Sequence, residues 1–132
     1  MNKADILETL RALNWPAADY WLVAGGAMVL YGLRPETSDL DLGCTTARAD
    51  ALAAAGVPCR SMDDGSGRWF TLSEGVEVFE NWLSDQVVLV EGVPVVSLVG
   101  LREMKRAFDR EKDRRDIQRI DAFLRTGSAD AL

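Results

Sequence analysis

Apolar residues recur along the chain at two spacings, and each spacing predicts one kind of secondary structure. Apolar positions three or four residues apart indicate amphipathic helices. On this basis helices are predicted over Ala4 to Asn14, Ala27 to Tyr31, Ala47 to Ala55, from the N-cap Ser97 to about Phe108, and over Lys112 to Leu124. Asn14 and Pro16 end the first helix, and Gly32 closes the second.

Short apolar runs and alternating polar and apolar positions indicate strands between these helices. They predict strands over Tyr20 to Ala24, Thr37 to Gly43, Arg68 to Leu72, Val76 to Phe79, Val87 to Val90 and Val93 to Val96. Glu91 and Gly92 separate the last two runs and predict a tight hairpin turn. The order of elements predicts an α/β (α+β) fold, in which helices pack on a mixed central sheet and further helices end the chain.

The length and the apolar content set the scale of the protein. The chain has 132 residues, enough for one domain with a hydrophobic core, so a single domain is expected over residues 1–132 with a frayed tail from about Thr126. The N-terminus lacks the apolar stretch of a signal peptide, and no apolar run is long enough to span a membrane. Cys44 and Cys59 fit no metal-binding or redox spacing. We therefore expect a cytoplasmic protein with two free thiols and no membrane partner.

The residue types that are missing narrow the possible chemistry. The sequence contains no histidine, which excludes Ser–His and Cys–His catalysis and histidine metal sites. The net charge is −6, but residues 102–119 hold eight basic and five acidic side chains, a local balance of +3, and the rest of the chain carries −9. A basic C-terminal segment on an acidic body is suited to steering phosphates toward one edge of the molecule.

Gly25 and Gly26 follow the first predicted strand and precede a helix. Glycine lets a ligand approach the backbone closely, and the free N–H groups of a first helical turn favour an anion. The same pair also fits a tight corner between a strand and a helix that binds nothing, so both interpretations stay open at this point.

Asp39 and Asp41 lie two residues apart on a predicted strand, so both side chains point to one face while Leu40 and Leu42 point to the core. Neighbouring carboxylates repel each other. A divalent cation such as Mg²⁺ relieves this repulsion and takes further oxygen ligands from a triphosphate. The alternative is a pair of solvated carboxylates at the edge of a strand.

Taken together, the glycine pair, twelve intervening residues and Asp-x-Asp on the next strand resemble the nucleotidyltransferase superfamily that includes DNA polymerase beta, and in particular its small minimal members. The resemblance implies a third acidic residue on a later strand. Glu77, between the inward-facing Val76 and Val78, is the first candidate, although the family more often has Asp at this place. Glu80 on the same strand is the alternative.

Downstream, Met104-Lys105 followed by Arg110-Glu-Lys-Asp113 looks like the C-terminal helices of these proteins, so that the resemblance extends from about Trp21 to Ile120. It implies that Lys105 contacts the phosphates, with Arg110 and Lys112 as further candidates. The alternative for these residues is a charged, solvated helix.

The implied chemistry is transfer of a nucleoside monophosphate from a nucleoside triphosphate, expected to be ATP, to an acceptor hydroxyl, with release of pyrophosphate and with Mg²⁺ or Mn²⁺ as cofactor. The resemblance makes Asp39, Asp41 and Glu77 the catalytic and metal-binding residues. It makes Gly25, Gly26, Arg34, Ser38 and Lys105 the residues that bind the phosphates. Trp69, Trp82 and Tyr31 are candidates for stacking on the base, with a place in the core as their alternative.

The sequence is consistent with two main functions. The first is an active, metal-dependent nucleotidyltransferase whose acceptor is a small alcohol, a tRNA or a protein, as in toxin members of the superfamily. The second is a nucleotide-binding or interaction module of the same fold without turnover, and a protein that binds no nucleotide is the remaining alternative. Because so short a chain has little room for an acceptor domain, a protein partner or a homodimer is expected to complete the acceptor site.

Overall fold

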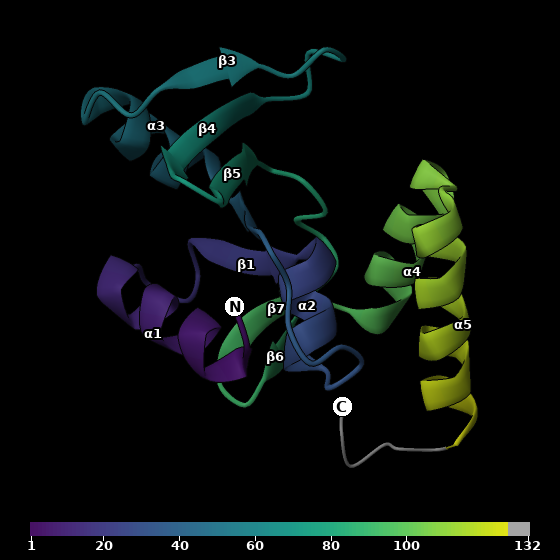
Figure 1. The fold of residues 1–132 in the computed structure, drawn as a ribbon. Coiled ribbons are helices and arrows are strands. Elements are labelled where there is room, and N and C mark those ends of the chain that lie inside the picture. The colour runs from purple at the N-terminus through teal and green to yellow at the C-terminus, as the bar shows by residue number, and fades with distance from the viewer. Residues whose placement is uncertain (127–132) are drawn as a thin grey trace.

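The computed structural model describes residues 1–126, and in this part of the chain five helices and seven strands follow one another (Figure 1). In chain order these elements are α1 (Lys3–Leu13), β1 (Tyr20–Val23), α2 (Ala24–Leu30), β2 (Leu40–Cys44), α3 (Thr46–Ala54), β3 (Cys59–Ser61), β4 (Arg68–Ser73), β5 (Val76–Glu80), β6 (Val87–Val90), β7 (Val93–Val96), α4 (Leu98–Phe108) and α5 (Glu111–Arg125). The predicted mixed α and β fold is confirmed.

All seven strands belong to one mixed sheet with the order β3-β4-β5-β2-β1-β7-β6. At its centre β2 is antiparallel to β1 and parallel to β5, and β1 is parallel to β7. The register of the β2–β5 pair places Asp41 directly beside Glu77. The neighbouring strands β2 and β5 therefore carry neighbouring carboxylates, which lie on the polar face of the sheet.

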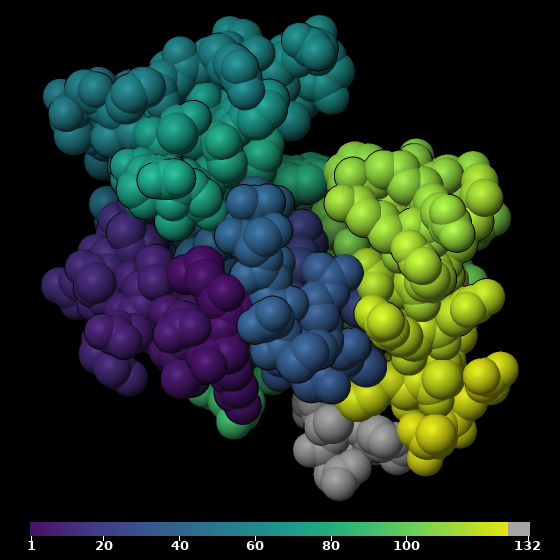
Figure 2. All heavy atoms as spheres, viewed as in Figure 1, coloured from purple at the N-terminus to yellow at the C-terminus, as the bar shows by residue number. Residues whose placement is uncertain are grey.

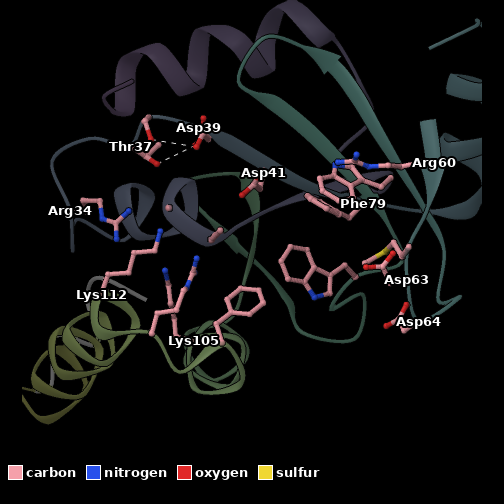
Figure 3. A pocket seen from close by; sticks show the side chains of 18 of the residues that line it. Arg34, Thr37, Asp39, Asp41, Arg60, Asp63, Asp64, Phe79, Lys105 and Lys112 are labelled. Atoms are coloured by element: carbon pink, nitrogen blue, oxygen red, sulfur yellow. Dashed lines mark hydrogen bonds between the residues drawn. The ribbon is translucent and has the colours of Figure 1, made fainter. Parts of the chain in front are cut away.

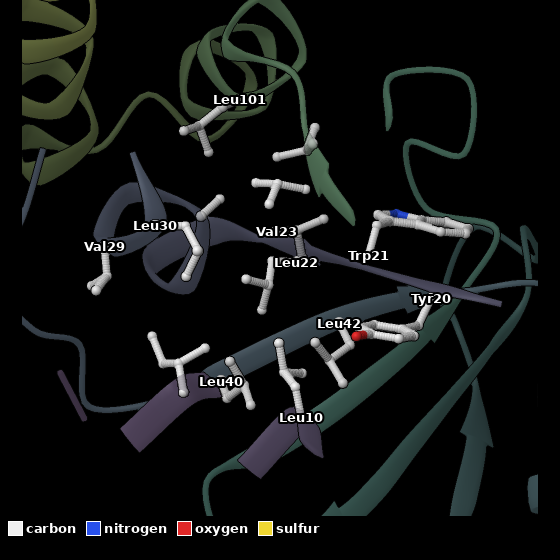
Figure 4. Close-up of a cluster of buried hydrophobic side chains, with 14 of the residues drawn as sticks. Leu10, Tyr20, Trp21, Leu22, Val23, Val29, Leu30, Leu40, Leu42 and Leu101 are labelled. Carbon is white, nitrogen blue, oxygen red and sulfur yellow. The ribbon is translucent and has the colours of Figure 1, made fainter. Parts of the chain in front are cut away.

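Side chains alternate between the two faces of the central strands, as a period of two requires. Leu40, Leu42 and Val78 are fully buried on one face, whereas Asp41 and Glu77 lie between them on the other. Figure 4 shows Leu40 and Leu42 beside Leu10 of α1, and Leu22 and Val23 of β1 complete this part of the core. The inward orientation predicted for Leu40 and Leu42 is confirmed.

Local signals in the sequence account for most element boundaries. The Ser97 side chain accepts a hydrogen bond from the Gly100 N–H and caps α4, as predicted. Glu91 and Gly92 both have positive φ angles, 52° and 79°, which gives the β6–β7 hairpin the twist of a two-residue turn. The bounds of β6 and β7 are those that the sequence predicts.

Three details differ from the sequence prediction. Helix α2 begins at Ala24, so Gly25 and Gly26 lie inside its first turn and do not precede it. Strand β2 begins at Leu40, so Asp39 lies just before the strand. Strand β3 was not predicted, because its three residues are all exposed and carry no apolar pattern.

Two further sequence expectations concern the C-terminal tail and membrane-spanning segments. Thr126 ends α5 as its C-cap, and the rest of the predicted tail, residues 127–132, lies outside the described residues. Among residues 1–126, no helix has the length and apolar character needed to cross a membrane.

Candidate functional site

A pocket of about 860 Å³ lies between the polar face of the sheet and the junction of α4 with α5. Figure 2 shows the surface indented where the teal strands β3–β5 meet the yellow-green helices α4 and α5. Six of the residues predicted for the site line this pocket: Gly25, Arg34, Ser38, Asp39, Asp41 and Lys105. The structure thus brings together residues that lie as many as 80 positions apart in the sequence.

Asp39 and Asp41 form the acidic wall of the pocket (Figure 3). Burial raises the pKa of Asp41 to about 6, and the negative charges of Asp39 and Glu77 add to this effect, while the positive charge of Lys105 opposes it. The Ser38 hydroxyl lies 3.4 Å from Oδ2 of Asp39, and the Thr37 hydroxyl donates to the Asp39 carbonyl oxygen. These carboxylates therefore form a concentration of negative charge that a divalent cation would stabilise.

Basic side chains line the pocket opposite these carboxylates. We call Arg34, Lys105, Arg110 and Lys112 the basic side of the pocket. In Figure 3, Arg34, Lys105 and Lys112 lie on the same side, below Asp39 and Asp41. The four cations come from the segment after α2, from α4 and from the start of α5, so tertiary folding is required to bring them together.

Two buried carboxylates of α5 hold the basic side in place. Lys105 is only 4% exposed, and its Nζ lies 3.0 Å from Asp116 and 3.6 Å from Asp113. Arg34 donates to Asp116 at 2.6 Å, and Arg110 donates to Asp113 through both Nε and Nη2. Since four cations including Arg119 surround these two anions, the cluster has an excess of positive charge.

The two glycines of α2 occupy different environments. Gly25 lines the pocket, and a Cβ atom at this position would lie 2.3 Å from the Thr37 hydroxyl oxygen. A Cβ atom on Gly26 would instead meet Leu40 at 3.1 Å and Leu22 at 3.4 Å. Gly25 therefore lets the Thr37 and Arg34 side chains pack against the backbone of α2 at the pocket wall, and Gly26 allows α2 to pack closely on the sheet.

Glu77 lies on the same face of the sheet as Asp41 but does not line the pocket. Its Oε2 accepts hydrogen bonds from the Trp69 indole N–H and the Thr71 hydroxyl, both on β4. Within residues 1–126, no three His, Cys, Asp or Glu side chains are grouped so that they could hold a metal ion. The carboxylate predicted as the third ligand is thus engaged by its neighbours on β4.

Glu80, the alternative third carboxylate, points to the opposite face of β5. It accepts three hydrogen bonds from Arg68, two of them from the guanidinium group. These bonds lower the pKa of Glu80 to about 2. Glu80 is therefore held by Arg68 and does not line the pocket.

Aromatic side chains form the third wall of the pocket. Four aromatic rings that line the pocket form a chain in which each ring contacts the next: Trp69, Phe79, Trp82 and Phe108. We call these four residues the aromatic row. Two of the aromatic residues proposed from the sequence, Trp69 and Trp82, belong to it. The third, Tyr31, is wrong as a stacking candidate, because it is buried and its hydroxyl donates to the Val96 carbonyl in the core.

Sequence reasoning did not identify the buried acids or half of the aromatic row. Asp113 and Asp116 share one face of α5 with Ile120, and this spacing would have indicated that both carboxylates are buried. Phe79 and Phe108 carry no comparable signal, because an aromatic residue on a strand or at a helix end is usually part of a core.

The sequence was also compared with known proteins: no family model matches it, and no curated protein does.

Proposed function

We propose that the protein is a metal-dependent nucleotidyltransferase that moves a nucleoside monophosphate from a nucleoside triphosphate to an acceptor hydroxyl. One observation carries this proposal. A single pocket sets the carboxylates of Asp39 and Asp41 opposite the basic side formed by Arg34, Lys105, Arg110 and Lys112. In a metal–triphosphate complex, the positive metal ion matches the carboxylates and the negative phosphates match the basic side.

The two carboxylates fit the ligand preference of Mg²⁺ and Mn²⁺. Mg²⁺ is usually bound by one or two carboxylates together with phosphate oxygens and water, so Asp39 and Asp41 suffice when a triphosphate supplies the remaining ligands. A third protein carboxylate is not required for this first binding step. When bound, the metal would stabilise the charge that develops on the phosphate during transfer.

The basic side suits the phosphates of the same ligand. The guanidinium groups of Arg34 and Arg110 offer several N–H donors to phosphate oxygens, and Lys105 adds a nearly buried charge whose interactions are weakly screened. Ser38 offers a hydroxyl beside Asp39. Gly25 lets the Arg34 guanidinium lie close to the backbone of α2 at the pocket wall, where it can meet a phosphate.

In the transfer step, the acceptor oxygen forms a bond to the α-phosphorus while the bond between that phosphorus and the pyrophosphate oxygen breaks. The acceptor proton passes to a carboxylate, and Glu77 is the proposed base because it lies beside Asp41 on the same face. Glu77 would have to turn from Trp69 and Thr71 toward the pocket. The pyrophosphate leaves along the basic side.

The position of Glu77 also favours the second function, a nucleotide-binding module without turnover. Such a module would keep the contacts of Asp39, Asp41 and Lys105 with a metal–nucleotide complex. Its Glu77 would remain bonded to Trp69, so no base would reach the acceptor hydroxyl. Binding without release of pyrophosphate would identify this function.

A labelled-transfer experiment tests the proposal. The purified protein is incubated with α-labelled nucleoside triphosphates and Mg²⁺ or Mn²⁺, and separate reactions receive total tRNA, cellular protein or a panel of small alcohols. We expect label in one acceptor pool with the wild type and none with Asp41→Asn. The exposed Asp85→Asn is the matched control, because it removes the same charge away from the pocket. Equal labelling by wild type and Asp41→Asn, or labelling of no pool, would exclude the proposed nucleotidyltransferase activity.

A further inference from the structure

We propose that the aromatic row binds the nucleobase of the nucleoside triphosphate by stacking, and that it makes the site prefer purines. This inference rests on the proposed function, because it assigns the part of the pocket that the metal and the phosphates do not use.

The row is continuous and includes residues of β4, of β5, of the segment that follows β5 and of α4. Trp69 of β4 lies 5.2 Å from Phe79 of β5, measured between ring centroids, and Phe79 lies 5.0 Å from Trp82, which follows β5. Trp82 lies 6.1 Å from Phe108, the last residue of α4. All four side chains line the pocket, so their rings form one aromatic wall along it.

An arginine stands at each end of this wall. The guanidinium carbon of Arg60 lies 3.6 Å from the centroid of the Trp69 ring, and that of Arg110 lies 5.0 Å from the centroid of the Phe108 ring. Both arginines also line the pocket. Aromatic rings combined with arginine are the surface on which proteins stack nucleobases, because every base has a π face.

The row is more exposed than the aromatic residues of the core. Phe108 is 46% exposed, and Trp69, Phe79 and Trp82 are half-buried, with Trp82 also packed against the core. Trp21 and Tyr31 are buried and donate their polar hydrogens to backbone carbonyl groups. Phe108 keeps this exposed area although the Arg110 guanidinium lies over its ring. The nucleobase is the occupant that the phosphate contacts proposed for Lys105 and Arg110 imply.

The row adjoins the basic side of the pocket. Phe108 lies three residues after Lys105 on α4, so both side chains project from the same side of that helix. Arg110 connects the two regions, since it lies over Phe108 and is also bonded to Asp113. A nucleotide whose phosphates contact Lys105 therefore has its base within reach of Phe108 and Trp82.

Stacking on such a surface depends on the area of the base more than on its hydrogen bonds. A purine covers more of the ring surface than a pyrimidine. We therefore expect ATP and GTP to bind more tightly than CTP and UTP.

Calorimetry with two charge-matched ligands tests the inference. ATP and ribose 5-triphosphate carry the same triphosphate, and only ATP has a base. With Mg²⁺ present and no acceptor, ATP is expected to bind wild type at least about fivefold more tightly, the lower end of the range for stacking of one base. Equal affinities would overturn the base site and leave the proposed function standing, while binding of neither ligand would overturn both.

Variants of Phe108 locate the effect. Phe108→Leu keeps an apolar side chain but removes the ring, and it should weaken ATP binding about fivefold without changing the affinity for ribose 5-triphosphate. Phe108→Trp should retain ATP binding. Val99→Ala, at an exposed apolar position of the same helix outside the pocket, is the control. An unchanged affinity for ATP in Phe108→Leu, or an equal loss for both ligands, would contradict the assignment.

Discussion

Asp41 and Glu77 are paired side by side on two parallel strands, so that two carboxylates occupy neighbouring positions on one face of the sheet. Both negative charges act on the same small volume, to which Asp39 adds a third. An arrangement of this kind destabilises the folded protein unless a cation is bound.

The first prediction concerns the pH dependence of stability. Burial and the charges of Asp39 and Glu77 raise the pKa of Asp41 from 3.8 to about 6 in the folded state. Folding therefore favours the protonated acid, and the stability that this provides is lost as the pH rises through 6. Asp41→Asn should raise the free energy of unfolding by about 1–2 kcal/mol at pH 7.5, after allowance for solvent screening, and change it little at pH 3.5.

Thermal or urea unfolding of the wild type and Asp41→Asn at both pH values provides the measurement. Added Mg²⁺ should stabilise the wild type at pH 7.5 and leave Asp41→Asn unchanged. A variant that is less stable than the wild type at pH 7.5 would show that the Asp41 carboxylate is already neutralised by other groups.

The second prediction compares two glutamates of β5. Glu77→Gln should abolish transfer, since an amide cannot accept the acceptor proton, while stability changes by less than about 1 kcal/mol because the amide oxygen can still accept from Trp69. Glu80→Gln should preserve transfer and lower stability by about 1–3 kcal/mol, because it weakens the charge-assisted bonds from Arg68. Transfer activity and the free energy of unfolding are measured on the same preparations of both variants. Normal transfer by Glu77→Gln would show that Glu77 is not the base.

The third prediction separates the structural role of Lys105 from the phosphate binding proposed for it. Replacement by Met leaves Asp113 and Asp116 with one partner fewer, and should lower stability by about 3 kcal/mol, since Arg34 and Arg110 remain. The Lys105→Met/Asp116→Asn pair should recover part of this stability. Triphosphate affinity should be reduced in both variants when titrated below their melting temperatures. If the paired variant binds triphosphate normally, Lys105 has only a structural function.

The fourth prediction uses the two adjacent glycines. Gly25→Ala places a methyl group 2.3 Å from the Thr37 hydroxyl and 3.0 Å from the Arg34 guanidinium, and it should weaken triphosphate binding at least about tenfold because both pocket side chains have to move. Gly26→Ala contacts only Leu22 and Leu40, so any effect should appear in stability. Affinities measured by calorimetry and midpoints of urea unfolding distinguish the two variants. A loss of affinity confined to Gly26→Ala would show that the wrong glycine has been assigned to the pocket.

Much of the fold follows from local signals in the sequence. The Ser97 cap, the Glu91-Gly92 turn and the alternation around Asp41 each act within a few residues, so the pattern alone locates α4, the β6–β7 hairpin and the buried face of β2. The third strand was missed because three exposed residues carry no such signal. Its place at the edge of the sheet depends on pairing with β4, and that pairing is a tertiary contact.

The candidate site was predicted as a group only where its residues lie close together in the sequence. The segment from Gly25 to Asp41 contains five predicted residues that line the pocket. The predicted residues outside this segment that also line it are Lys105, Arg110, Lys112, Trp69 and Trp82. The buried partners of Lys105 and the aromatic row come from five other elements or connecting segments, and they meet only because α4 and α5 fold back beside the sheet. The engagement of Glu77 by Trp69 depends in the same way on the register of β4 with β5.

We propose that Asp39 and Asp41 bind the metal of a metal–triphosphate complex in this pocket. Its most direct test is a calorimetric titration of ATP into the wild type, the Asp39→Asn/Asp41→Asn variant and the Asp85→Asn control, each with Mg²⁺ and with EDTA. We expect ATP to bind the wild type and the control only when Mg²⁺ is present, and the double variant to lose at least about tenfold in affinity. Equal affinity in EDTA, or an unchanged affinity in the double variant, would contradict it.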